Sequence, residues 1–431
     1  MKRLLFFLIC VFFSKTSYSN VDISINKGID ISTPIGISSF EWVEVNENNN
    51  YENISKIISC DLQNSGKFSP IEIYKESNKS IEKQIKNNSI NLNKLNINTI
   101  LTGKISLNYN GEYLISYKLI DLVNYPGKIL LSGYRTVHLQ SFRKVAHEIS
   151  NEIFKKLTGI QGVFHTRIAY ILYNKNNEYK YKLCISDYDG YNQNIIHQSN
   201  MPLMSPSWSP DGKKIAYVTF EKGSSEIKIK DIKTGSIKHI SSFPYHNGAP
   251  AFSPNGENLA FALSKTGSLN LYVMNLKNGY IKQITHGNSN NTEPSWFPDN
   301  NSLAYTSDQS GTPQIYKINI SNGKFNRLSW LGSKNQNANV SPDGKFIAMV
   351  NSEKKSQHIA LFDINMDNAK IITETFLDEA PSISPNNVMI IYTSSYGDSS
   401  VIELISTNGR FKTSILKING QIKFPAWSQK I

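Results

Sequence analysis

The sequence predicts a mainly β protein, with a six-bladed β-propeller in the C-terminal two-thirds and a small α/β domain before it. Three observations support this fold class: a motif that recurs every 43 or 44 residues, four strand-like segments in each repeat, and an N-terminal region without the repeat. Four short strands over about 40–45 residues are typical of a propeller blade. A helical solenoid would instead need apolar residues at a spacing of 3.6, which these segments lack.

The repeat is clearest in variants of a Pro-x-Trp-Ser-Pro-Asp-Gly motif. The fourth residue of its six copies is Ser209, Ser253, Phe297, Ser341, Ser384 and Ser428. A second landmark keeps the same period at Asp187, Asp231, Asn275, Asn319, Asp363 and Ser406. Proline presets φ and glycine or asparagine accepts positive φ, so the Pro-Asp-Gly and Asn-Gly pieces predict turns between strands.

We interpret this motif as mainly structural. Its aromatic position is expected to pack between blades, and its acidic position to serve turns and not catalysis. The aromatic residues concerned are Trp208, Phe252, Trp296 and Trp427, and the acidic ones are Asp211 and Asp343.

The offset of the motif predicts how the ring closes. The first blade has no copy upstream, and the chain end supplies one at residues 425–428. We therefore expect the C-terminal strand to become the inner strand of the first blade, which leaves no open sheet edge at the seam. The predicted organisation is a signal peptide at 1–19, an N-terminal α/β domain at 20–160, and a propeller at 161–431.

The first residues have the pattern of a secretory signal peptide. Lys2 and Arg3 precede ten apolar residues at 4–13, and Ser17 and Ser19 give the small-x-small pattern of a cleavage site. Ten apolar residues are too few to span a bilayer, which takes about 20. We predict cleavage after Ser19 and an exported mature chain without membrane insertion; a buried strand or short helix is the alternative.

The N-terminal domain shows mixed strand and helix signals. We predict strands at 21–25 and 34–42, a helix at 54–65 that ends at Gly66, a hairpin of 101–107 with 113–122, and a helix at 141–157 that ends at Gly159. His147 and Glu148 on the second helix lack a second histidine four residues after His147, so we interpret this pair as surface.

Composition excludes several functions. The chain has 46 basic and 34 acidic residues, a net charge of +12, but its lysines are scattered among asparagines, which does not favour nucleic-acid binding. After cleavage only Cys60 and Cys184 remain, too few for a disulfide framework or a cysteine metal site, and we expect two buried thiols.

No catalytic or cofactor motif is recognisable. The sequence lacks G-x-S-x-G, H-E-x-x-H, the P-loop and G-x-G-x-x-G, and its eight histidines lack ligand spacing. A catalytic Ser/His/Asp set brought together by the fold is not excluded by the sequence. The loops that lead into the inner strands should surround one mouth of the central channel. They are rich in Asn, Thr, Glu, Asp and some aromatic residues, which suits either ordinary polar loops or a site for an incoming backbone.

Several stretches resemble the TolB family, periplasmic propeller proteins of the Tol-Pal envelope system. They are residues 246–254, 262–274, 291–299 and 423–428 in the propeller, and 34–37, 64–68 and 154–159 before it. The resemblance implies a monomeric, non-enzymatic periplasmic protein. It implies that the channel mouth binds the lipoprotein Pal, that the mature N-terminal strand binds TolA, and that ordering of this strand is coupled to the Pal site. Roles in envelope integrity and in outer-membrane constriction at cell division follow, and colicin-type peptides can occupy the same mouth.

The resemblance also indicates the contact residues. By matching motif, the Pal contacts are His246, Ala249, Thr292 and Glu293, and by loop position Met204, Asn337, Asp378 and Glu379 are added. The TolA segment maps to residues 20–31, with Asn20, Val21, Asp22, Ile23, Ser24 and Ile25 as the binding strand.

Two other functions remain open. The same repeat type occurs in the propellers of prolyl-oligopeptidase-like and tricorn-like peptidases, although neither the N-terminal region nor the tail offers a nucleophile elbow. A cation in the channel is permitted by the acidic residues at the mouth, without a visible ligand set. No cofactor is expected.

Overall fold

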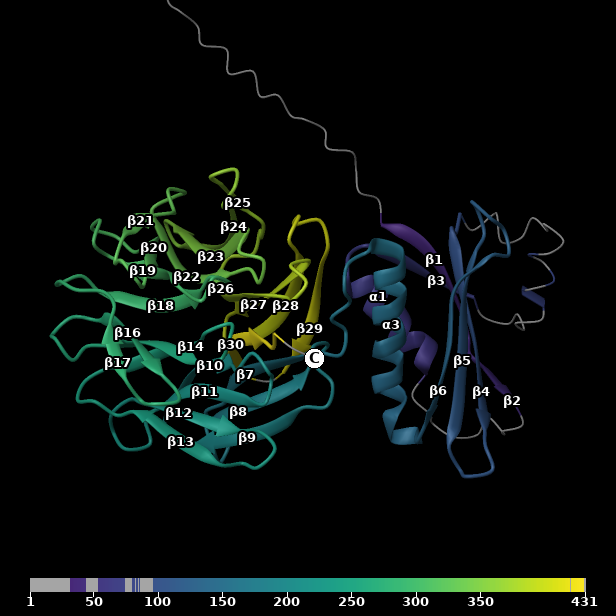
Figure 1. Ribbon diagram of the computed structural model, residues 1–431, viewed down its shortest axis with the longest axis horizontal. Coiled ribbons are helices and arrows are strands. Elements are labelled where there is room, and N and C mark those ends of the chain that lie inside the picture. Colours follow the sequence, from purple (N-terminus) through teal and green to yellow (C-terminus); the bar gives the residue numbers. More distant parts are fainter. Residues whose placement is uncertain are drawn as a thin grey trace, which may run out of the picture.

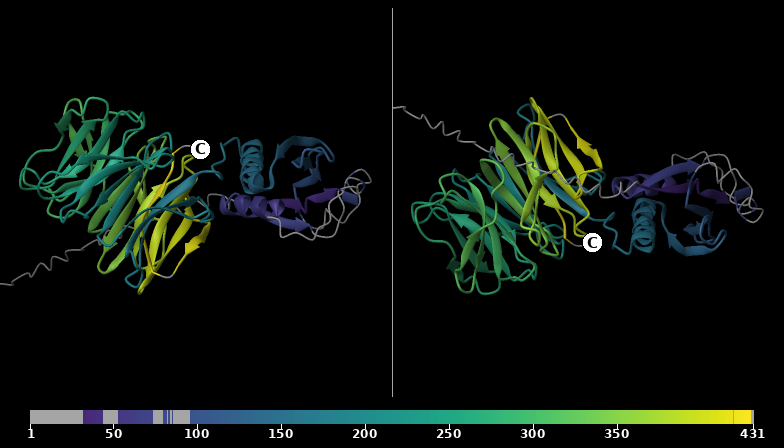
Figure 2. Two further views of the ribbon diagram at one scale, coloured as in Figure 1. Left: turned by 90° about the horizontal axis from the view of Figure 1, so that it is seen from below. Right: turned by 90° about the horizontal axis from the view of Figure 1, so that it is seen from above.

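A computed structural model describes residues 32–43, 53–73, 80–81, 83, 85, 96–418 and 420–429. The predicted signal peptide and the predicted strand at 21–25 lie outside these residues. Two domains lie side by side, and two helices of the N-terminal domain lie between its sheet and the propeller (Figure 1). Figure 2 shows the same arrangement from two further directions.

The N-terminal domain is a six-stranded sheet with helices on one face. Its elements are β1 (Thr33–Ser38), β2 (Glu41–Val43), α1 (Ile54–Asn64), β3 (Phe68–Ile73), β4 (Thr99–Leu107), β5 (Tyr113–Asp121), β6 (Ile129–Val137), a 3-10 turn (Leu139–Ser141) and α3 (Phe142–Thr158). The sheet order is β3-β1-β4-β5-β6, and β2 also pairs with β4. Strands β1, β3 and β4 pair in parallel, whereas β4, β5 and β6 form an antiparallel meander.

Both predicted helices and the predicted hairpin are present. In α1, Ile54, Ile58 and Leu62 are buried at a spacing of four residues, and the side chain of Asn53 accepts the first-turn amide of Lys56. Helix α3 ends at Gly159, whose φ of 74° is left-handed. The strand predicted at 34–42 is divided into β1 and β2, and β3 and β6 were not predicted.

The propeller consists of six four-stranded antiparallel sheets. Blade 1 is β30 (Gln421–Trp427), β7 (Arg167–Tyr173), β8 (Tyr181–Asp187) and β9 (Asn194–Ser199); blade 2 is β10 (Leu203–Trp208), β11 (Lys214–Thr219), β12 (Glu226–Asp231) and β13 (Ile237–Ser241); blade 3 is β14 (Asn247–Phe252), β15 (Asn258–Leu263), β16 (Asn270–Asn275) and β17 (Ile281–Gln283). Blade 4 is β18 (Asn291–Trp296), β19 (Ser302–Ser307), β20 (Gln314–Asn319) and β21 (Phe325–Arg327); blade 5 is β22 (Lys334–Val340), β23 (Phe346–Glu353), β24 (Ser356–Asp363) and β25 (Asn368–Ile371); blade 6 is β26 (Asp378–Ile383), β27 (Met389–Tyr396), β28 (Ser399–Ser406) and β29 (Lys412–Lys417).

The first blade is completed by the last strand of the chain. Strand β30 pairs with β7 in antiparallel register, with Ile422 opposite Leu172 and Trp427 opposite Ile168. Both Ile422 and Trp427 are buried. This is the closure that the offset of the repeat predicted, and it leaves no unpaired edge at the seam.

At least one polar contact joins the inner strands at each of the six blade boundaries. At four boundaries a side-chain oxygen accepts a backbone amide of the next inner strand: Ser207 from Phe252 (3.4 Å), Ser295 from Val340 (3.0 Å), Asn339 from Ile383 (2.8 Å) and Ser382 from Trp427 (3.0 Å). Alanine occupies this repeat position twice. There the indole of Trp296 donates to the carbonyl of Ala251 (3.0 Å), and that of Trp208 to Ala426 (2.9 Å).

The motif residues thus have the structural roles that the sequence predicted. Trp208 and Trp296 lie in apolar clusters made from two neighbouring blades. The carboxylate of Asp211 accepts the hydroxyl of Ser209 and the amide of Lys213, and Asp343 does the same for Ser341 and Lys345. These bonds fix the turn after the inner strand.

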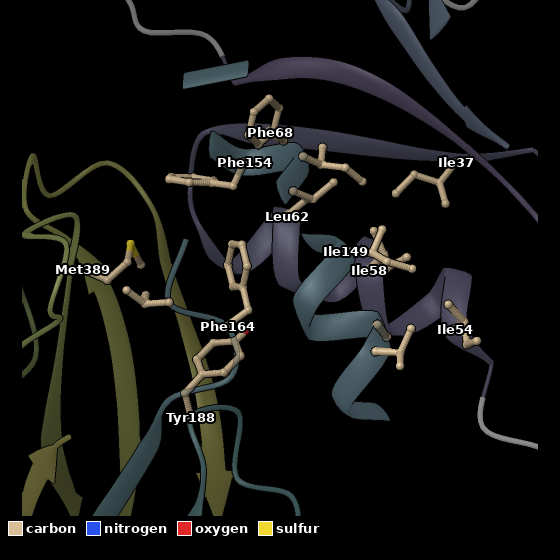
Figure 3. Packing of buried hydrophobic residues seen from close by; sticks show 14 of the residues in the cluster. Ile37, Ile54, Ile58, Leu62, Phe68, Ile149, Phe154, Phe164, Tyr188 and Met389 are labelled. Carbon is tan, nitrogen blue, oxygen red and sulfur yellow. The ribbon is translucent and has the colours of Figure 1, made fainter. Parts of the chain in front are cut away.

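The two domains share one apolar core. Residues of α1 and α3, such as Leu62 and Phe154, belong to the same buried cluster as Tyr188 and Met389 of the propeller (Figure 3). Phe164 of the connecting segment fills the space between them, and its amide donates to the side chain of Asn151 on α3 (2.9 Å). The connection between the domains is therefore packed against both of them.

Two predictions about single residues were wrong. His147 is only 2% exposed and not a surface residue, because its face of α3 turns toward α1 and the propeller. Cys60 is exposed and not buried, because it lies outside the stripe that Ile54, Ile58 and Leu62 form on α1. Cys184 is buried as predicted, and both thiols are free.

Truncating the tryptophan at the seam should destabilise the whole fold. Trp427 is 3% exposed and stacks on Tyr188, and its indole donates to Thr166 (2.7 Å). We expect Trp427→Ala to lower the free energy of unfolding by about 3–5 kcal/mol in urea denaturation. The control is Trp330→Ala, at a tryptophan that is 70% exposed, for which we expect a loss below about 0.5 kcal/mol. Equal losses in the two variants would contradict a special role of the seam.

Candidate functional site

A channel of about 650 Å³ runs along the propeller axis, and residues of all six inner strands line it. Each inner strand begins at one face of the propeller and ends at the other. We call the first face the mouth, where the loops before the inner strands lie, and the second the far face. The N-terminal domain contacts far-face turns, since Asn386 donates to Gln161 (3.0 Å) and Gly66 lies against Phe411.

Every inner strand carries a bulge at the same point. The register with the neighbouring strand shifts there, and one residue per blade has positive φ: Ser205 (50°), Ala249 (49°), Glu293 (54°), Asn337 (55°), Ala380 (52°) and Phe424 (53°). All six line the channel. Positive φ is costly for residues other than glycine, and such residues concentrate at functional sites. In five blades the next residue is proline, which has no amide to lose from the ladder.

The carboxylate of Glu293 braces one of these bulges. Its Oε2 accepts the hydroxyl of Thr306 at 2.7 Å within its own blade. The same oxygen accepts the backbone amide of Asn337 in the next blade at 2.8 Å. Glu293 therefore fixes the backbone of its neighbour at the channel wall, in addition to lining the channel itself.

A layer of buried amides supports the mouth two residues before the positive-φ position. Asn247, Asn291 and Asn335 are almost fully buried, and each donates to the preceding blade: to Ser225 O, Asn270 Oδ1 and Gln314 Oε1. Asp378 holds this position in blade 6 and accepts the hydroxyls of Thr373 and Thr375. This role was not predicted from the sequence, although Asn recurs at this repeat position in three blades.

The structure brings together most, but not all, of the predicted Pal contacts. The residues that line the channel are Met204, His246, Ala249, Thr292, Glu293 and Asn337. Asp378 does not line it, because its side chain is fully buried in the supporting layer. Glu379 is exposed but outside the channel lining, where its neighbour Ala380 takes the place. The predicted TolA strand, Asn20–Ile25, lies outside the described residues.

His246 stands at the rim of the mouth. Its side chain lies over Gly248, where an added Cβ would collide with the imidazole Nε2. Only glycine fits at position 248 with the ring in this place. Partial burial of the ring disfavours its charged form and lowers the pKa of His246. The imidazole is thus a neutral, partly apolar surface for a ligand near pH 7.

Large apolar side chains surround the mouth. Tyr245, Trp330 and Phe376 are 75%, 70% and 61% exposed, and they belong to loops that precede β14, β22 and β26. Aromatic residues with one wet face are enriched in protein interfaces. Aromatic residues were expected in these loops, but Trp330 and Tyr245 were not predicted as site residues.

Among the described residues, one group of side chains has the composition of a metal site, and it lies away from the channel. Asp61, His147 and Asp189 place potential ligand atoms within 4.8 Å of one another at the domain interface. The guanidinium of Arg143 contacts the carboxylate of Asp189 and so already supplies a cation there.

The fold and the channel define a class of protein: a closed six-bladed propeller with a strained channel wall and exposed aromatic residues at the mouth, joined to a small α/β domain. Two family models match the chain, the TolB amino-terminal domain over residues 21–127 and the TolB beta propeller domain over residues 154–431. The chain belongs to the TolB family. In the described part of the chain, no helix is both long and apolar enough for a bilayer crossing.

Individual relatives agree with this assignment. The chain is 54% identical over 421 residues to the Tol-Pal system protein TolB of Escherichia coli O8 (strain IAI1), covering 97% of this chain and 96% of that protein. It is 50% identical over 415 residues to the protein of the same name from Hamiltonella defensa, covering 95% of each. A crystal structure of TolB from Acinetobacter baumannii superposes with a TM-score of 0.83 at 34% identity, over 93% of this chain and 97% of that one.

Glu293 allows a test of the channel wall. We expect Glu293→Ala to lower the free energy of unfolding by about 1–3 kcal/mol, because the Asn337 amide and the Thr306 hydroxyl lose a shared acceptor. Glu293→Gln keeps an oxygen acceptor and should cost less than about 1 kcal/mol. Urea denaturation measures both, with Glu374→Ala at an exposed position of a mouth loop as control. A large loss in Glu293→Gln would show that the charge and not the acceptor matters.

Proposed function

We propose that the chain is a periplasmic interaction component of the Tol-Pal system that binds the lipoprotein Pal at the channel mouth. In this proposal residues 1–19 are removed on export, and the strand Asn20–Ile25 of the mature chain binds TolA. The protein then contributes to envelope integrity and to constriction of the outer membrane at cell division. It acts by binding and not by catalysis.

The ring of positive-φ residues is the observation that carries the Pal proposal. Six repeats hold a costly backbone conformation at the same depth of the channel, around His246, Thr292 and Glu293. Strain of this kind persists where the surrounding structure enforces it, commonly at binding sites. The mouth also offers exposed aromatic side chains, which provide the contact area that a protein partner needs.

The size of the channel indicates how a partner would engage. Its volume of about 650 Å³ is in the range of ligand pockets and far below that of a folded domain. A partner would therefore insert a loop or a few side chains, while the rim residues Tyr245, Trp330 and Phe376 contact the surface around the inserted segment. Colicin-type peptides could enter in the same way.

The placement of the two domains supports two binding surfaces that do not compete. The mouth lies at one face of the propeller, and the N-terminal domain contacts turns of the other face, such as those at Asn386 and Phe411. A partner at the mouth would therefore leave the described part of the N-terminal domain accessible to a second partner.

Filling the mouth should abolish Pal binding without unfolding the propeller. Thr292 lines the channel and is a cleaner test position than Glu293, whose carboxylate also braces the neighbouring blade. We expect Thr292→Phe to lose Pal in a pull-down with purified Pal while keeping the thermal stability of the parent. The control is Lys277→Phe, which puts the same side chain on an exposed far-face turn and should leave Pal binding unchanged.

A second arm separates the two partners. Deletion of residues 20–25 should remove binding to TolA and leave binding to Pal. Retention of Pal by Thr292→Phe would reject the mouth as the Pal site, and retention of TolA by the deletion variant would reject the strand. Cleavage of a peptide library by the purified protein would favour the peptidase-like alternative.

A further inference from the structure

A buried polar cluster joins the two domains on the far face of the propeller. It consists of Asp61 on α1, Arg143 and His147 on α3, and Tyr188 and Asp189 in the turn after β8; we call it the interdomain cluster. Asp61 and His147 are 1% and 2% exposed, and the Arg143 and Asp189 side chains are 8% and 12% exposed. The shared apolar core surrounds the cluster, so its charges are not solvated as surface charges are.

Asp61 is the centre of this cluster. Its Oδ2 lies 2.8 Å from Nδ1 of His147, and its Oδ1 accepts the hydroxyl of Tyr188 at 2.7 Å. The first contact holds α1 against α3, and the second crosses from the N-terminal domain to the propeller. One carboxylate therefore connects the histidine to the docking of the domains.

Arg143 of α3 makes the second polar contact between the domains. Its guanidinium contacts the carboxylate of Asp189, its Nε lies 3.4 Å from Asp187, and it stacks on the ring of Tyr191 at 3.8 Å. Asp189 and Tyr191 lie in the turn between β8 and β9 of blade 1, and Asp187 is the last residue of β8. The contacts of Asp61 and Arg143 thus both reach the turn after β8.

The charges of the cluster do not balance without a proton. Asp61 and Asp189 carry two negative charges, against which Arg143 supplies one positive charge; Asp187, outside the cluster, lies opposite Arg167 of β7. The remaining charged groups near His147 are Glu148 and Lys144 on its own helix, which are 30% and 71% exposed, and His165 of the connecting segment. His147 is therefore the group at which a second positive charge can be placed inside the cluster.

A metal ion could also supply positive charge to the cluster, but it fits the contacts of Asp189 less well than a proton on His147. Asp189 is one of three residues that could ligate an ion here, but its carboxylate is engaged by Arg143. A metal would have to displace the guanidinium and leave it buried without its partner, which is costly. A proton on His147 displaces no partner of this kind: Nδ1 faces Asp61 in both charge states, and the added proton goes to Nε2, which is buried without a hydrogen-bond partner among the described residues.

We propose that the interdomain cluster is a proton-operated latch, in which protonation of His147 tightens the docking of the N-terminal domain on the propeller. The imidazolium neutralises Asp61, which holds Tyr188 across the interface. Loss of the proton leaves the cluster with an excess of one negative charge, and repulsion between Asp61 and Asp189 loosens the polar contacts between the domains.

The direction of the pH dependence follows from the surroundings of His147. Burial alone would lower the pKa of His147, but the charge of Asp61 and the hydrogen bond to it outweigh burial and raise it above the usual value. Asp189 acts in the same sense, since burial raises the pKa of its carboxyl despite the attraction of Arg143. A raised pKa means that the contribution to docking is complete below about pH 6.5 and is lost as the pH rises through the value in the folded protein.

Distances between spin labels on the full-length mature chain would test the latch. One label goes on Asn110→Cys at the hairpin tip of the N-terminal domain and the other on Lys277→Cys in blade 3, both exposed, in a Cys60→Ser background. We expect a narrow distance distribution at about pH 6 and a broader one at about pH 8.5. His147→Asn should be broad at both values, because its neutral side chain leaves the charge of Asp61 uncompensated at either pH.

Controls separate the latch from a general effect of pH. His286→Asn changes an exposed histidine and should keep the broadening of the parent. Tyr188→Phe removes the hydrogen bond to Asp61 across the interface but keeps His147 and Asp61. Its distance distribution should be broad at both pH values. A parent distribution that does not change with pH, a His147→Asn variant that is narrow at about pH 6, or a broadening that requires removal of metal by EDTA would each overturn the proposal. If His147→Asn does not fold, Tyr188→Phe and the parent decide the question.

Discussion

The fold depends on the pairing of β30 with β7, because this pairing of the last strand with the first blade closes the ring. Without it, β7 would present an unpaired edge, and the inner strand of blade 1 would be missing from the channel wall. Trp427 at the end of β30 extends the effect beyond the ring. Its amide is bound by Ser382 of blade 6, its indole donates to Thr166 of the connecting segment, and its ring stacks on Tyr188. Ring closure and domain docking therefore share one residue.

The strained channel wall is a consequence of the closed ring. A residue at positive φ persists only if its neighbours enforce the conformation. Here polar contacts join each inner strand to the inner strands of the blades before and after it. Glu293 shows the mechanism, since its carboxylate spans from Thr306 to the amide of Asn337 across a blade boundary. The buried amides of Asn247, Asn291 and Asn335, two residues before the positive-φ position, hold each strand to the preceding blade. The mouth is thus preorganised by contacts between blades, which lowers the ordering cost of binding.

The sequence predicted the blades well because a propeller repeats its turn chemistry every blade. Period, strand content and closure all follow from the positions of Pro-Asp-Gly and its variants. The bulges were not predictable, because a positive φ at Ala249 or Phe424 leaves no signature in residue type. Asp378 was misplaced for a related reason: a polar residue near the mouth suggests a contact, whereas alignment with Asn335 would have indicated the supporting layer. In the N-terminal domain, Pro70 within β3 and Gly133 within β6 hide two strands, since both residues disfavour strands.

His147 shows what distance in the sequence conceals. Its partner Asp61 lies 86 residues away on another helix, and Tyr188 lies in the other domain, so no local pattern could reveal the cluster. The packing around the cluster also limits what its charges can do. Replacing a buried ionic group by apolar residues is often neutral, so the adhesion between the domains comes mainly from residues such as Leu62, Phe164 and Met389. The polar contacts add orientation, because the hydrogen bond from Tyr188 to Asp61 has a preferred length and direction. Deprotonation of His147 should therefore widen the range of domain orientations without separating the domains, since the apolar contact that holds them does not titrate.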